Sequence, residues 1–179
     1  MKSSILPVFP QRDPVLWNQF LRCLQVNNGN DHLCGPDFVP LEHEFHYSQN
    51  LSNKIEKGSL IVFSEVRQGD SEPVFVGFDN LDVVRKRAQF FYAMSEKSLG
   101  SKEYISAFTG AIKYGFVNLD LRRITTFVAG NSLNVQTTFN SFGFKKEGVL
   151  REYLGSAKSF DDLVVYGILR SECLLNFEV

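Results

Sequence analysis

Two lysines and a glycine just ahead of a helical pattern form the first group of residues that could do chemistry. Gly100 stands between Lys97 and Lys102, and an amphipathic run begins directly afterwards. A glycine turn at a helix start can bind a phosphate, because free backbone N–H groups and the positive end of the helix dipole point at the anion. By itself, one glycine between two lysines is more typical of a solvated turn. Whether these residues bind a phosphate must therefore be judged from the rest of the chain.

Carboxylates, tyrosines and histidines supply the candidate acids and bases. The candidate bases are Glu42, Glu44, Asp79 and Asp82. Asp82 is our first choice for the residue that takes a proton from a nucleophile, and its alternative is a turn or surface carboxylate. Tyr92 is the candidate acid, and its alternative is packing in a strand. His43 and His46 could share a helical face, and either could act as a base. Their spacing is not that of a His-Glu-x-x-His motif. No third ligand is evident, so we predict no metal site.

Hydrophobic periodicity predicts the elements that must hold these residues. Short β-rich runs separated by polar turns predict antiparallel strands in the first half of the chain. Asp13 followed by Pro14 predicts a helix start, since the first caps and the second fits the first helical position. The elements predicted in this half are a strand over residues 4–9, a helix from residue 14 to the turn at 27–30, a helical region over 37–56, and strands over 59–66, 73–82 and 88–94.

After Met94 the pattern changes to helices that alternate with strands. The elements predicted there are an amphipathic helix over residues 104–119, a strand over 123–128, a helix opened by Asn131 and Ser132 and closed at 142–144, and an apolar strand over 163–169. This order predicts a single α+β domain over residues 1–179, with one mixed sheet and helices on both of its faces.

Composition restricts the classes of function. The formal net charge is −1 and no long basic run exists, which argues against a nucleic-acid partner. No stretch is long and apolar enough for a membrane span, and the first residues do not read as a signal peptide. The three cysteines have no CxxC spacing and predict reduced thiols, so we expect a cytoplasmic protein. Most of the 17 phenylalanines should be core.

The second half of the chain resembles the GCN5-related N-acetyltransferase (GNAT) superfamily. The resemblance rests on the strand–helix alternation and on the run from Asn131-Ser132 through Phe142-Gly143-Phe144 to Glu152. Within the superfamily, the chain most resembles the ribosomal-protein and amino-sugar N-acetyltransferase branch. It implies a mostly antiparallel sheet of about six to seven strands, splayed after the fourth strand. It also implies transfer of acetyl from acetyl-CoA to a primary amine, which could be a protein N-terminus, an amino sugar or a small amine.

The resemblance also implies a donor site. The pyrophosphate of acetyl-CoA would lie on the turn before the long helix, the pantetheine arm along the end of the fourth strand, and further contacts would come from the last helix. The residues that this places at the cofactor are Ala93, Met94, Lys97, Gly100, Ser101, Lys102, Asn131, Ser132 and Phe139.

Three positions depart from the family pattern. Lys102 stands where a small residue is expected, Gln89 aligns near the place of a frequent Glu, and Phe139 replaces a frequent proton-donating Tyr. These departures leave two alternatives open. The chain could be a catalytically weakened binding or accessory module of the same fold, or an acyltransferase for a longer acyl-CoA or an acyl carrier protein. The sequence allows a monomer or a homodimer.

Overall fold

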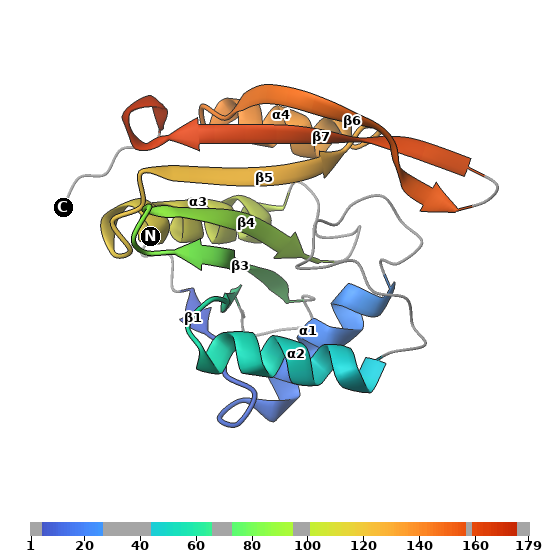
Figure 1. The fold of residues 1–179 in the computed structure, drawn as a ribbon. Helices are drawn as coiled ribbons and strands as arrows, with labels where there is room; N and C mark the ends of the chain where they lie inside the picture. Colours follow the sequence, from blue (N-terminus) through green and yellow to red (C-terminus); the bar gives the residue numbers. More distant parts are fainter. Residues whose placement is uncertain (1–4, 27–43, 66–72, 95–100, 157–158, 175–179) are drawn as a thin grey trace.

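The computed structural model describes residues 5–26, 44–65, 73–94, 101–156 and 159–174. Seven strands form one sheet in the order β1-β2-β3-β4-β5-β7-β6 (Figure 1). The strands are β1 (Leu6–Pro7), β2 (Ile61–Glu65), β3 (Val74–Asp82), β4 (Arg87–Ala93), β5 (Arg123–Ala129), β6 (Lys145–Ser156) and β7 (Ser159–Leu169). The helices are α1 (Pro14–Val26), α2 (Glu44–Glu56), α3 (Lys102–Val117) and α4 (Leu133–Ser141), and a 3₁₀ turn covers Arg170–Glu172.

The predicted helix starts have local causes that the structure confirms. The N–H of Trp17 donates to the carbonyl of Asp13 at 2.9 Å, so α1 begins at Pro14, whose missing N–H costs nothing at that position. The hydroxyl of Ser101 accepts from the N–H of Tyr104 at 3.1 Å and caps α3. The proline at the first helical position marks the start of α1, and the Ser101 side chain caps the start of α3.

Helices cover both faces of the sheet, as the sequence predicts. On one face, Phe20 of α1 packs against Phe75 of β3 and Phe91 of β4, with ring centroids 5.4 and 6.0 Å apart. On the other face, Phe90 of β4 packs against Phe108 of α3 at 5.1 Å. In Figure 1, α3 lies behind β4 and α4 behind β7, whereas α1 and α2 lie beside the N-terminal strands. Neighbouring side chains along β4 thus point to opposite faces of the sheet, and each face packs against a different layer of helices.

The longest strand is one that the sequence does not predict. β6 runs from Lys145 to Ser156 and pairs antiparallel with β7, although its sequence is charged and interrupted by glycine. The pairing register shifts between Lys146 and Gly148 and again between Leu150 and Leu154. Such bulges break the alternation of apolar and polar residues by which a strand is recognised. Pairing with the apolar β7 strand therefore decides the conformation of this segment.

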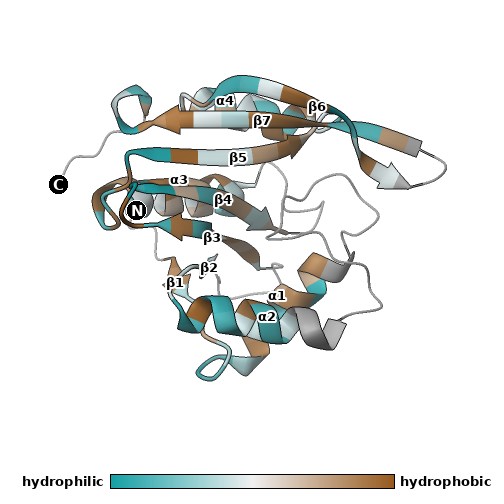
Figure 2. Cartoon of the chain, viewed as in Figure 1, coloured by the Kyte–Doolittle hydropathy of each residue, from teal (hydrophilic) through white to brown (hydrophobic). Residues whose placement is uncertain are grey.

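β4 and β5 are the only parallel neighbours among the described strands, and α3 connects them. Every other pair is antiparallel. The mostly antiparallel mixed sheet is therefore confirmed. Figure 2 shows both strands hydrophilic where they start and more apolar toward their C-terminal ends.

Candidate active site

The sheet opens between β4 and β5. These strands pair only over residues 87–89 and 123–125, and beyond that point neither has the other as a partner. Residues 90–93 pair instead with β3 alone, and residues 126–129 with β7 alone. The predicted splay is confirmed, although it begins at residue 90 and not after Met94. Backbone groups that face such a gap can pair with an extended ligand as an added strand would.

Aromatic side chains form the floor of the opening on the face of α3 and α4. The Phe139 ring of α4 lies 5.9 Å from Phe90, 6.0 Å from Tyr92 and 5.4 Å from Phe108, measured between centroids. It also stacks on Tyr166 of β7 at 6.4 Å. None of the first four side chains has measurable exposure. The expectation that Phe139 is core or wall agrees with this packing, and its contact with a cofactor stays a prediction.

Tyr92, Ala93 and Met94 lie at the open end of β4 and are all buried. Ala93 pairs with Phe75 of β3. Because β3 occupies one edge of β4 here, the opposite edge of β4 faces the opening. The position agrees with the predicted pantetheine contact of Ala93 and Met94, and that contact remains a prediction.

The N-terminus of α3 is described from Ser101 onward. Ser101 caps the helix, and Lys102 is its first residue and exposed. Lys97 and Gly100, which we also expect at the pyrophosphate, lie outside the described residues. Because α3 follows β4, its N-terminus lies at the open end of the sheet. The described half of the predicted loop thus brings the N-terminus of a helix and a lysine to the same end as Met94.

The turn between β5 and α4 holds the two other predicted cofactor residues. Asn131 is exposed, and its N–H donates to the Asp161 carboxylate at 3.2 Å. Ser132 is buried and is the N-cap residue of α4, as predicted by position. Its hydroxyl lies 3.3 Å from the Asn131 side-chain oxygen and makes no capping hydrogen bond to the helix. Ser132 therefore opens α4 without a side-chain cap, and the cofactor contacts expected of both residues stay predictions.

Asp82 ends β3, at the end of the sheet opposite the opening. It pairs with Arg87, at the start of β4, whereas Met94 follows the end of that strand. The N–H and guanidinium of Arg85 both donate to its carboxylate, which lowers the pKa of Asp82. Its role as a base stays a prediction, but its place at the opposite end of the strand argues against it. Gln89 is held at the same end, accepting from the Asn80 amide at 3.3 Å.

Three polar residues near the opening escape the sequence analysis. Glu65 ends β2 with 8% exposure, at the same end of the sheet as Met94 because β2 runs in the direction of β4. Tyr104 lies buried in the first turn of α3, where burial raises the pKa of its phenol to about 12 and the Thr138 hydroxyl offsets part of the rise. Gln136 of α4 binds the carbonyls at the end of β5. Nothing local in the sequence marks these residues, because each acquires its neighbours from a different element.

Two further observations concern metals and membranes. Among the described residues, no three His, Cys, Asp or Glu side chains gather so that they could hold a metal ion. Within the same part of the chain, no helix has the length and apolar character needed to cross a membrane.

Comparison with known proteins places these features in context. No known family profile matches the chain. The uncharacterized N-acetyltransferase p20 of Bacillus licheniformis is 29% identical over 123 residues, which are 69% of this chain and 67% of the relative. The putative ribosomal N-acetyltransferase YdaF of Bacillus subtilis (strain 168) is 28% identical over 97 residues, 54% of this chain and about half (53%) of the relative. A dodecameric spermidine N-acetyltransferase of Vibrio cholerae has the same fold, with a TM-score of 0.72, 17% identity and 94% of each chain covered.

Proposed function

We propose that this chain, a member of the GNAT superfamily of N-acetyltransferases, transfers an acetyl group from acetyl-CoA to a primary amine. The observation that carries the proposal is the opening between β4 and β5, whose strands pair only over residues 87–89 and 123–125. An acyl-pantetheine arm is an extended chain with amide groups, so it can hydrogen-bond to both strand edges. The helix amides at Lys102 lie at the same end and suit the pyrophosphate.

In this proposal the protein contributes chiefly by position. A neutral amine attacks the thioester carbonyl carbon, a C–N bond forms, and the C–S bond breaks to release the CoA thiolate. A backbone N–H near Met94 polarises the carbonyl, because it donates to the oxygen on which negative charge develops. Holding both reactants in line removes most of the entropic cost of the encounter.

The proton balance needs an acid for the thiolate and a base for the amine. Phe139 cannot donate a proton, so Tyr92, whose ring lies 6.0 Å from Phe139, is the acid in this proposal. Asp82 is remote from the opening, whereas Glu65 ends β2 on the same side of the sheet as Met94 and is the base in this proposal. Replacing Tyr92 by Phe and Glu65 by Gln, each with a full pH profile of kcat/KM, tests these two assignments.

The acceptor in this proposal is an amine, and the names of the similar proteins suggest which classes of amine to test. One relative is named a putative ribosomal N-acetyltransferase, and one structural neighbour is a spermidine N-acetyltransferase. We therefore propose a panel of three acceptor types: an N-terminal peptide, an amino sugar and a polyamine. Acetyl-CoA is supplied and the released thiol is measured. Turnover with one acceptor type identifies the class, and no turnover with any of them, despite tight binding of acetyl-CoA, contradicts the acetyltransferase proposal.

A second candidate function has one observation in its favour. The aromatic ring of Phe139 fills the place where a tyrosine hydroxyl is frequent, which supports a catalytically weakened binding module. Binding of CoA without turnover would favour this module. The longer-acyl alternative has less support, because the rings of Phe90, Tyr92 and Phe108 already pack against Phe139 and have no measurable exposure. Competition by acyl-CoAs of increasing chain length tests it.

A further inference from the structure

Residues 126–129 of β5 border the opening and are called the β5 lip below. This segment ends in a turn that side chains hold in place. The carbonyls of Ala129 and Gly130 lie where the β5 lip passes into this turn, before the chain enters α4. The N–H of Gly130 donates to the Asp162 carbonyl at 2.8 Å, and the N–H of Ser132 donates to the Ala129 carbonyl at 3.1 Å. Backbone hydrogen bonds therefore tie the turn both to β7 and to the end of β5.

Gln136 adds the side-chain part of this arrangement. Its amide nitrogen donates to the carbonyl of Gly130 at 2.8 Å and to that of Ala129 at 3.2 Å. Its amide oxygen accepts from the Tyr166 hydroxyl of β7 at 3.3 Å. An amide group has two N–H donors and one carbonyl acceptor, so this single side chain ties α4, the end of β5 and β7 together with all its polar atoms in use.

An acidic or apolar side chain cannot replace the amide donor of Gln136 at this point. A carboxylate in place of the amide would face two carbonyl oxygens without a donor, and an apolar side chain would leave both carbonyls with one partner fewer. Because β4 gives no support to residues 126–129, the lip depends on β7 and on this turn for its position.

We propose that Gln136 is a positioning residue for the acyl donor: it holds the β5 lip where the pantetheine arm pairs with it, and Tyr166 holds Gln136. The inference rests on the proposed function. Gln136 itself touches neither the thioester nor the amine in this proposal. Its loss therefore weakens donor binding and leaves the chemical step nearly intact.

The test compares Gln136→Leu and Gln136→Glu with Thr137→Ala. Thr137 is the exposed neighbour on α4, and its hydroxyl donates to the Leu133 carbonyl, within its own helix. Acetyl-CoA affinity is measured by calorimetry, KM and kcat by thiol release, and folding by thermal unfolding. For Gln136→Leu we expect Kd and KM of acetyl-CoA to rise about tenfold, the equivalent of one or two lost hydrogen bonds. We expect kcat and the acceptor KM to stay within about threefold, and Thr137→Ala to match the wild type.

Gln136→Glu provides a readout that a purely structural role would not move. Its protonated carboxyl regains one O–H donor, so acetyl-CoA affinity should recover partly as the pH falls, whereas that of Gln136→Leu should not. A folded Gln136→Leu protein with wild-type acetyl-CoA affinity overturns the inference, even if its unfolding temperature is lowered. A wild-type protein that fails to bind acetyl-CoA contradicts the proposed function itself, which is a distinct outcome.

Discussion

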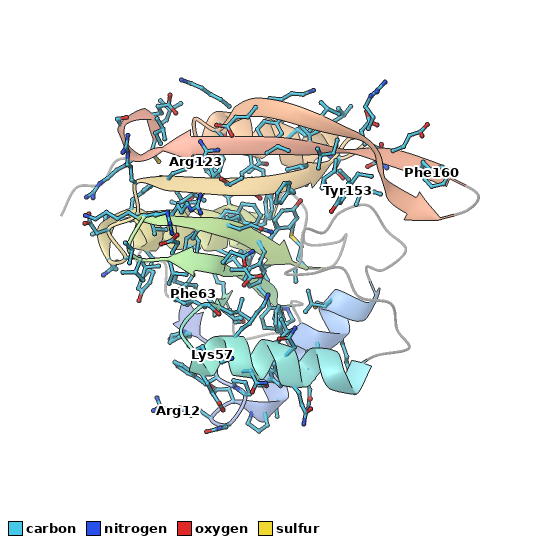
Figure 3. The ribbon with its side chains drawn as sticks, in the orientation of Figure 1. Arg12, Lys57, Phe63, Arg123, Tyr153 and Phe160 are labelled. Carbon is cyan, nitrogen blue, oxygen red and sulfur yellow. The ribbon has the colours of Figure 1, made fainter. Side chains whose placement is uncertain are left out.

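The two ends of the β4–β5 pair are built from different chemistry. At the closed end, where residues 87–89 pair with 123–125, charged side chains form ion pairs across neighbouring elements. These are Asp82 with Arg85 and Arg87, Asp120 with Lys86 and Arg170, and Arg123 with Glu147. At the open end the side chains are aromatic and buried. Figure 3 shows Arg123 at the closed end, with Tyr153 and Phe160 toward the far end of the β6–β7 hairpin.

The difference shows which end contributes more to the stability of the fold. Exposed ion pairs contribute little to stability, because solvent screens them and their side chains lose freedom on pairing. Buried aromatic rings contribute far more through the area that they remove from water. The charged end therefore contributes little to stability, whereas the aromatic floor holds the helices beneath the place where β4 and β5 part.

The largest expected effect is at the aromatic floor. Phe108 contacts Phe90, Tyr92, Tyr104 and Phe139, so Phe108→Ala removes the ring that they share. We expect a loss of about 3–5 kcal/mol in the free energy of unfolding, as for other buried aromatic truncations. Urea unfolding measures it. Ile105→Ala on the same helix is the control, because Ile105 is 40% exposed and should cost much less. Equal losses in the two variants would contradict the dominance of the floor.

A second prediction concerns Tyr104 at high pH. Burial raises the pKa of its phenol from 10.0 to about 12, because the folded protein disfavours the phenolate. The associated stability is fully present below pH 10 and is lost as the pH rises from 10 to about 12. The loss should reach about 2–3 kcal/mol, the value of a two-unit shift.

Urea unfolding at pH 8, 10 and 11 measures this loss, of which about half should be present at pH 11 and the rest near pH 12. Tyr104→Phe should be less sensitive to alkali than the wild type, whereas Tyr153→Phe should not be, since Tyr153 is 65% exposed. Identical alkaline profiles for wild type and Tyr104→Phe would show that Tyr104 is not the titrating group.

The third prediction tests the open end as the donor site. If Lys102 contacts a phosphate, Lys102→Ala should weaken acetyl-CoA binding by about 1–2 kcal/mol, the range for a hydrogen bond to a charged group. The difference between variant and wild type should shrink as salt is added. Calorimetry at two ionic strengths measures both effects. Lys146→Ala, an exposed lysine of β6 that lies near the closed end, is the control and should bind like the wild type. Tight binding that is indifferent to Lys102→Ala would leave backbone amides as the only contact.

The smallest expected effect is at the closed end. Hydrogen bonds and charge from Lys86, followed by those from Arg170, hold the pKa of Asp120 below its ordinary value of 3.8. The stability that Asp120 contributes is therefore present above about pH 4 and is lost as the pH falls through its lowered pKa. Asp120→Asn should lower the unfolding temperature slightly at pH 7 and low salt, and the difference should vanish at high salt. A large, salt-independent loss would mean that this end carries more of the stability than exposed ion pairs can.

Much of the fold could be predicted from the sequence, because local patterns carry it. The helix that starts at Pro14, the strands β2 to β5 and the alternation after Met94 follow from caps and periodicity. β6 could not be predicted, because its bulges and charges hide the strand pattern until β7 provides a partner. The hydroxyl of Ser132 fails as a cap for a related reason, since Asn131 is a competing neighbour.

The candidate site shows the same division. The sequence by itself placed Met94, Lys102 and Phe139 at element ends and faces, since their positions depend on neighbours within a few residues. Only the tertiary structure decided that Asp82 lies at the closed end, that Phe139 packs into a floor and that Gln136 fastens the β5 lip. The physical reason is that strand register and helix packing depend on partners distant in the chain. A side chain's neighbours across a sheet cannot be read from its own segment.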